Sequence, residues 1–124
     1  MLFRSGTSYG IITPLVHGIT SIVDREAFDV RRWYRILAQE KVSVWYTSPS
    51  AIRRLMHAEI SPRSTYDLGA LRLICSVGEP LYAGAVHWAE RTLGLPIVDT
   101  WWQTETGAIM IAPVPGATPT KPGS

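Results

Sequence analysis

The amino-acid sequence predicts an α/β protein with a mostly parallel β-sheet flanked by helices. Short apolar runs alternate along the chain with segments in which apolar residues recur at helical spacing. These runs are almost continuously apolar, which is typical of parallel strands that are covered on both faces. A chain of 124 residues with 46% hydrophobic and 18% charged residues also has the composition of a folded domain rather than a disordered one.

The composition excludes several classes of protein. A net charge of +2, with its arginines scattered, argues against nucleic acid as the main partner. No apolar run approaches the ~20 residues that span a bilayer, so we expect no membrane association. The single cysteine, Cys75, excludes an internal disulfide and a multi-cysteine zinc site, and the first residues lack the parts of a signal peptide. We therefore expect a reducing, cytoplasmic setting.

The first third of the chain predicts a helix, a strand and a second helix. Ser8 can cap a helix that ends at Gly18, although Pro14 inside it predicts a kink or an early stop. Residues 20–23 form a short apolar run and are expected to be a strand. Asp29 is a favourable N-cap for the next helix, in which apolar residues follow i, i+3, i+4, i+7 spacing.

The rest of the chain continues the alternation of strand and helix. Ser48 followed by Pro49 opens a helix, and an apolar stripe over residues 82–93 predicts another that ends at Gly94. A polar, turn-rich stretch separates them. We expect strands at 42–46, 71–77 and 97–101, with a candidate further strand at 108–112 and a proline-rich segment at 113–124.

Polar residues gather where these strands end. Ligands of parallel sheets bind beyond the carboxyl ends of the strands. That rule selects three segments of this chain: 47–48, 78–80 and 102–107.

Residues 99–107 carry the strongest chemical signal, because paired indoles, hydroxyls, an amide and carboxylates crowd into nine positions. Hydroxyls and turn N–H groups suit phosphate oxygens, and a carboxylate such as Glu105 suits Mg²⁺, which binds one or two protein carboxylates plus substrate phosphate. A flat indole can wall a small pocket or cover a purine. The alternative is a turn anchored in the core by tryptophan, with Glu105 in solvent.

The other polar residues give weaker signals. Gly78-Glu79-Pro80 can let a ligand approach the backbone, or can be a plain strand-to-helix turn with a carboxylate favoured by the helix dipole. We interpret the remaining candidates as structural or solvated residues, and no glycine-rich phosphate loop with lysine occurs. These candidates are His17, His57, His87, Cys75, Arg53 and Arg54.

Several motifs together resemble one known family. The run 99–107, Asp-Thr-Trp-Trp-Gln-Thr-Glu-Thr-Gly, closely resembles the signature of the acetyl-CoA synthetases, the AMP-forming acetate–CoA ligases of the adenylate-forming superfamily. Residues 76–81, Ser-Val-Gly-Glu-Pro-Leu, resemble the adenine-binding turn of that family at the expected distance upstream. Residues 44–53 and 6–10 are similar to its intervening segments in order and spacing.

The resemblance implies a two-step reaction, in which acetate and Mg·ATP give acetyl-adenylate and pyrophosphate, and the thiol of coenzyme A then displaces AMP. It assigns Thr104 to the α-phosphate, Glu105 to Mg²⁺, and Val77 and Trp102 to the wall of the acyl pocket. The catalytic residues would be Thr104 and Glu105. The nucleotide site would comprise Gly78, Glu79, Pro80, Asp99, Thr100, Trp101, Trp102, Gln103 and Thr104.

The chain also departs from the family pattern. Arg4-Ser5 stand where the family has a Val-Thr pair that serves the acyl and coenzyme A sites, which leaves a role of Ser5 at the coenzyme A site open. The family's phosphate loop, its ribose-binding Asp and its domain with the catalytic Lys have no counterpart here. The resemblance therefore implies that residues 1–124 are a partial AMP-binding (adenylation) domain of the adenylate-forming fold, inactive alone, with 113–124 leading into further sequence.

Two other interpretations stay open at this point. The parent enzyme could prefer propionate or another short-chain acid to acetate. The chain could also be a nucleotide-binding module without catalysis. The sequence leaves the oligomeric state undetermined.

Overall fold

A computed structural model describes residues 7–114, 116–118 and 121. Its centre is a three-stranded parallel sheet in the order β1 (Val44–Thr47), β2 (Leu73–Ser76), β3 (Ile97–Asp99). Val44 pairs with Leu73 at one end of the first ladder, and Ser76 pairs with Asp99 at the end of the second. The predicted parallel α/β architecture is confirmed.

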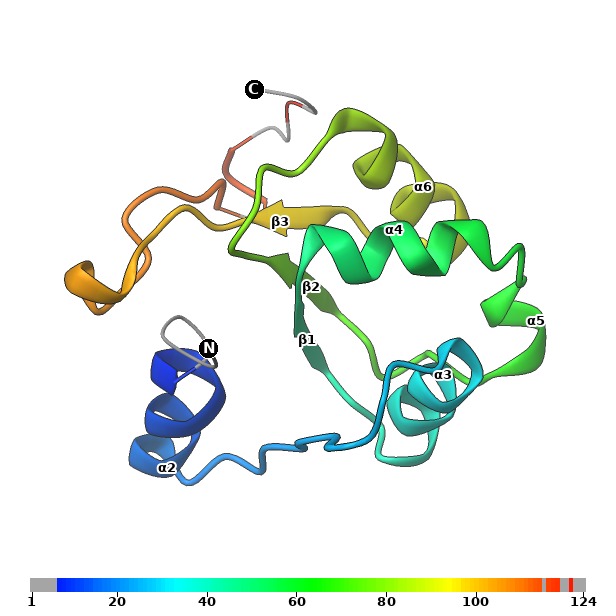
Figure 1. Ribbon diagram of the computed structural model, residues 1–124, viewed down its shortest axis with the longest axis horizontal. Helices are drawn as coiled ribbons and strands as arrows, with labels where there is room; N and C mark the ends of the chain where they lie inside the picture. Colours follow the sequence, from blue (N-terminus) through cyan, green and yellow to red (C-terminus); the bar gives the residue numbers. More distant parts are fainter. Residues whose placement is uncertain (1–6, 115, 119–120, 122–124) are drawn as a thin grey trace.

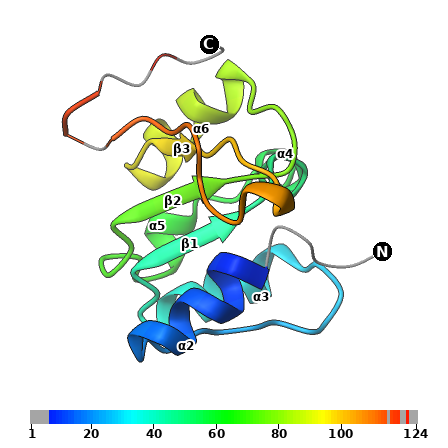
Figure 2. The same cartoon turned by 90° about the vertical axis from the view of Figure 1, so that its left-hand side faces the viewer.

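Helices cover the two faces of the sheet unequally (Figures 1 and 2). The first described element is a π-helical turn, η1 (Ser8–Ile12), which runs directly into α2 (Thr13–His17) on one face. The other helices lie on the opposite face and at its rim. They are α3 (Val30–Gln39), α4 (Pro49–His57), α5 (Pro62–Thr65) and α6 (Ala83–Leu93).

The core lies between the sheet and this second layer of helices. Ile74 and Ile97 point from the strands toward Ile52 of α4 and Ala89 of α6, and all four side chains are almost fully buried. Tyr34 of α3 closes the same cluster. Burial of this apolar surface is the main force that holds α3, α4 and α6 on the sheet, at about 25 cal/mol per Å² removed from water.

Predicted caps set the ends of several helices. The Asp29 carboxylate accepts a 2.7 Å bond from the Arg32 backbone N–H, and the Ser48 hydroxyl accepts a 3.3 Å bond from the Ala51 N–H. Gly18 ends α2 with φ +63°, a left-handed conformation that glycine adopts without strain. The first helix changes from π to α one residue before Pro14, which has no N–H to donate.

Two strand predictions are wrong. Residues 20–23 form no strand, because no described segment pairs with them; Val23 is 71% exposed. Residues 108–112 make only an isolated antiparallel bridge, Trp101 to Ile111. The predicted strands are also longer than those observed, and the turn-rich stretch contains the short helix α5. In the part of the chain that the structure describes, no helix has the length and hydropathy to cross a bilayer.

Candidate functional site

The carboxyl ends of the three strands meet at one edge of the sheet. Thr47 is opposite Ser76, and Ser76 is opposite Asp99, so the chain leaves each strand at the same level. Figure 1 shows the strand arrows pointing to this edge, with residues 100–112 extending beyond it. The three segments selected from the sequence, 47–48, 78–80 and 102–107, therefore all follow strand ends on one side of the fold.

The turn after β2 is fixed to the start of α4. Ser50 Oγ lies 2.6 Å from Glu79 Oε1 and 2.7 Å from Oε2, so its hydroxyl donates to the carboxylate. Gly78 has φ +94°, a conformation that side chains rarely adopt, and nothing lies within 4 Å of where its Cβ would be. The backbone at Gly78 is consequently open to a ligand, while the acid beside it is held in place.

The end of β3 is tied to β2 by side chains. Ser76, which is fully buried, donates from Oγ to Asp99 Oδ1 over 3.0 Å. Thr100 donates from Oγ1 to the Ser76 carbonyl over 2.7 Å, and its own N–H donates to the same carbonyl over 3.0 Å. These bonds fix the start of the segment 99–107. They also turn the Thr100 hydroxyl into the protein.

The indole of Trp102 is buried against two tyrosines. Its Nε1–H donates to Tyr46 Oη over 2.9 Å, and the Tyr9 ring meets it edge-on at a centroid distance of 5.2 Å. Tyr46 and Tyr9 also contact each other, with centroids 5.8 Å apart. Trp102 is 7% exposed, so its indole is buried rather than on the surface. Trp101 is 59% exposed, and its backbone pairs with Ile111.

A short 3₁₀ turn, η2 (Thr104–Thr106), presents the polar part of the segment. Thr106 stabilises the turn, because its Oγ1 lies 2.8 Å from the Gln103 carbonyl, to which it donates, and 3.3 Å from the Gln103 N–H, from which it accepts. Gly107 ends the turn at φ +70°. Gln103, Thr104 and Glu105 are exposed, and Glu105 has neither a hydrogen-bond nor an ion-pair partner among the described residues.

This free carboxylate suits one mode of magnesium binding. The described residues contain no group of three or more His, Cys, Asp or Glu side chains that could hold a metal by themselves. Mg²⁺, however, usually keeps several waters and binds through one or two carboxylates plus substrate phosphates. An exposed, unpaired Glu105 beside the hydroxyl of Thr104 fits that mode, in which the nucleotide brings the remaining oxygen ligands.

Sequence reasoning missed four residues that support the site: Tyr9, Tyr46, Ser50 and Ser76. A signal for Tyr46 was present, because it is a polar-tipped aromatic residue one position before the end of an otherwise apolar strand. Ser50 and Ser76 gave no separate signal. Ser5, the candidate at the coenzyme A site, lies outside the described residues.

The structure confirms Cys75 as a buried strand residue, and burial raises the pKa of its thiol.

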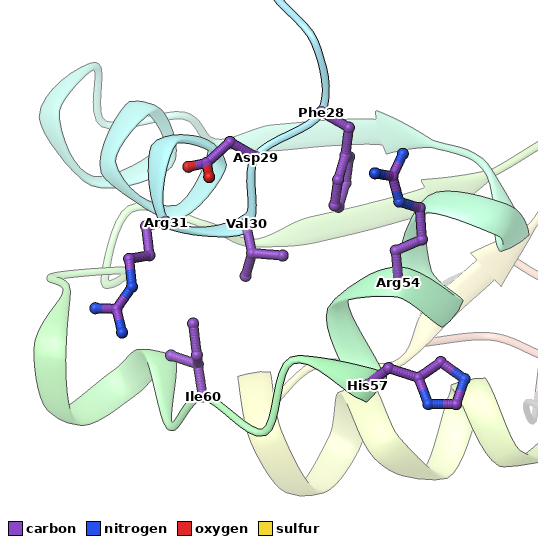
Figure 3. A pocket seen from close by; sticks show the side chains of 7 residues that line it. All are labelled: Phe28, Asp29, Val30, Arg31, Arg54, His57 and Ile60. Carbon is purple, nitrogen blue, oxygen red and sulfur yellow. The ribbon is translucent and has the colours of Figure 1, made fainter.

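Elsewhere, a cavity of about 450 Å³ lies between the start of α3 and the end of α4 (Figure 3). Phe28 and Val30 line it, and the Arg54 guanidinium lies 4.0 Å from the centre of the Phe28 ring. This cavity is in the helical layer and is lined by none of the strand-end residues.

Comparison with known proteins identifies the family of this chain. Residues 1–124 match the family described as AMP-binding enzyme. The chain belongs to the AMP-binding enzyme family. This membership accounts for the parallel sheet flanked by helices.

Curated relatives in this family are acetyl-coenzyme A synthetases. The chain is 44% identical to that of Beijerinckia indica over 126 aligned residues and 45% identical to that of Chromobacterium violaceum. The alignments cover 97% of this chain but only 20% and 19% of those proteins. The chain thus spans about a fifth of the length of the relatives it matches.

Solved structures of family members have the same fold. The anthranilate CoA ligase AuaEII, in complex with anthranoyl-AMP, superposes with a TM-score of 0.85 at 26% identity, over 98% of this chain and 23% of that one. The Brucella canis acyl-CoA synthetase gives a TM-score of 0.86 at 30% identity, over 98% of this chain and 22% of that one. The predicted partial subdomain of an adenylate-forming enzyme is therefore confirmed.

Proposed function

We propose that this chain forms the adenine turn and the acyl-pocket wall of an AMP-forming acetate–CoA ligase. One observation carries the proposal. The parallel register of β2 and β3 brings the turn 78–80 and the segment 99–107 to one edge of the sheet, and Trp102 stands there as a fixed, buried indole. The curated relatives, which are acetyl-coenzyme A synthetases, support acetate as the acid.

The nucleotide binds along this edge. Gly78 gives the adenine close access to the backbone, while Glu79 and Pro80 shape the turn. Asp99 to Thr104 line the rest of the nucleotide site, and Thr104 contacts the α-phosphate. Asp99 and Thr100 serve this site through the bonds that set the course of the segment, since the Thr100 hydroxyl points inward.

Trp102 and Val77 limit the acyl pocket. An indole fills the space that a longer acyl chain needs, so that acetate fits and each added methylene is disfavoured by about 1–3 kcal/mol. Propionate is the runner-up substrate within this class. The carboxylate of the acid attacks the α-phosphorus, pyrophosphate leaves, and the thiol of coenzyme A then displaces AMP from the acetyl-adenylate.

Charge neutralisation and positioning supply most of the catalysis in such a reaction. Mg²⁺ held by Glu105 would neutralise negative charge on the phosphate oxygens. Thr104 donates from its hydroxyl to the α-phosphate. The hydrogen bonds between the ends of β2 and β3 hold the segment that carries Thr104 and Glu105 in position. We expect this enzyme to work in the cytoplasm, with small-molecule substrates and without nucleic acid or membrane.

Ser5 is the candidate residue of this chain at the coenzyme A site. The chain spans about a fifth of its relatives, so the phosphate loop, the catalytic Lys and the rest of the coenzyme A site would come from further polypeptide. We therefore expect the 124-residue chain alone to form no acetyl-CoA.

A chimaeric ligase tests the proposal. Residues 7–114 would replace the matching segment of the Beijerinckia indica acetyl-coenzyme A synthetase, and pyrophosphate release and acetyl-CoA formation would be measured with acetate, Mg·ATP and coenzyme A. We expect both products. A folded chimaera that binds AMP but releases no pyrophosphate would instead support the nucleotide-binding module without catalysis.

A further inference from the structure

A directed chain of hydrogen bonds runs from Trp102 into the sheet. The indole Nε1–H can only donate, and its acceptor is Tyr46 Oη at 2.9 Å. Tyr46 Oη is in turn 2.8 Å from Thr100 Oγ1. Thr100 uses its one hydroxyl proton for the Ser76 carbonyl, at 2.7 Å.

These contacts assign every proton in the chain. Because the Thr100 proton goes to a carbonyl, which cannot donate, Thr100 Oγ1 must accept from Tyr46. Tyr46 therefore donates to Thr100 and accepts from Trp102. The Tyr46 phenol is protonated at neutral pH, as an ordinary tyrosine is, and burial raises its pKa further. The far end is anchored, since Ser76 is fully buried in the central strand.

The tyrosine rings restrict the remaining motion of the indole. Tyr9 meets Trp102 edge-on, with an interplanar angle of 79°, and the Tyr9 hydroxyl accepts from the Ile109 N–H over 3.0 Å. Tyr9 thus connects the first helix, the indole and the chain after η2. Rotation of the indole would break the bond to Tyr46 and lose this edge contact.

We propose that Tyr46 is a positioning residue that sets acyl-chain selection by holding the Trp102 indole in one orientation. Tyr46 acts through Trp102 and does not itself touch the substrate. The consequence for the acid rests on the proposed function, whereas the hydrogen-bond chain does not. Tyr46 belongs to β1, whereas Thr100 and Trp102 follow the end of β3, so the hydrogen bonds tie the segment that carries the indole to the sheet.

The first test uses the 124-residue chain with ¹⁵N-labelled tryptophan, which gives five indole signals. Loss of the Trp102 signal in Trp102→Phe assigns it. In Tyr46→Phe we expect that signal to move and its hydrogen exchange to accelerate about two- to tenfold, while the other four stay in place. An unchanged Trp102 signal in Tyr46→Phe would overturn the proposal.

A second pair of variants covers the case in which Tyr46→Phe does not fold. Thr100→Val removes the acceptor of the Tyr46 proton, and Thr100→Ser keeps it. We expect faster exchange at Trp102 in the valine variant and wild-type exchange in the serine variant. Equal exchange in both would contradict the proposal. Tyr34→Phe is the matched control, because that hydroxyl has no partner among the described residues and should leave the indole signal unchanged.

The chimaeric ligase then tests acyl selection. Tyr46→Phe should raise KM for acetate with little change in kcat, and should lower the acetate-to-propionate ratio of kcat/KM about three- to tenfold. Tyr34→Phe should change neither. If Trp102→Gly admits longer acids while Tyr46→Phe leaves the ratio unaltered, the positioning role fails and the proposed function stands. If Trp102→Gly also has no effect, the proposed function fails.

Discussion

Ser50 and Glu79 are joined across 29 residues of sequence, with the Ser50 hydroxyl oxygen 2.6 and 2.7 Å from the two carboxylate oxygens of Glu79. Ser50 is in the first turn of α4, where the helix dipole also favours a negative charge. The turn that is proposed to face adenine is therefore held by the helix that follows the neighbouring strand.

Ser50→Ala should loosen this turn. We expect the free energy of unfolding to fall by about 0.5–1.5 kcal/mol, because the carboxylate loses its donor, and KM for ATP in the chimaeric ligase to rise. Urea titration and steady-state kinetics measure the two effects. Ser64→Ala is the matched control, since Ser64 donates only to a local carbonyl on an exposed surface; an equal rise in KM for ATP there would contradict the account.

Tyr34→Phe should stabilise the protein. The Tyr34 hydroxyl is buried without a hydrogen-bond partner among the described residues, and removing it should raise the free energy of unfolding by about 1 kcal/mol. Chemical denaturation measures this. Tyr82→Phe, which loses the 2.8 Å bond from Tyr82 Oη to Met56 Sδ, should show no such gain.

Because of Tyr34, we also expect the protein to lose stability at alkaline pH. Burial raises the pKa of Tyr34 from 10.0 to about 12, so the folded state binds its proton more tightly than the unfolded state. The contribution of the protonated Tyr34 to the free energy of unfolding is fully present below pH 10. It is lost as the pH rises from 10 to about 12. Thermal unfolding followed across this range should show the loss, and Tyr34→Phe should reduce it. An identical pH profile in the variant would exclude Tyr34 as its source.

Glu105→Gln should impair the adenylation step. In the chimaeric ligase we expect the rate of pyrophosphate release to fall on the order of a hundredfold and the Mg²⁺ concentration for half-maximal rate to rise, because an amide binds the cation poorly. Glu90→Gln on the exposed side of α6 is the matched control and should leave both unchanged. If Glu105→Gln kept the normal Mg²⁺ dependence, Glu105 would not be a ligand of the metal.

The sequence predicted the parallel sheet because strands β2 and β3 are almost continuously apolar and end at polar turns. The strand prediction failed at residues 20–23, where local β-propensity was high but no strand among the described residues pairs with them. The sequence could not predict the bond from Trp102 to Tyr46 either. That contact spans 56 residues and depends on register and rotamer, which local patterns do not determine.

Exclusion of longer acids by the Trp102 indole can be measured with three substrates. In the chimaeric ligase, kcat/KM would be measured for acetate, propionate and butyrate with Trp102 and with Trp102→Gly. We predict that acetate is preferred with the indole present, and that the glycine variant gains activity on butyrate while its activity on acetate falls. A glycine variant that still excludes butyrate, with its fold intact by circular dichroism, would contradict the account.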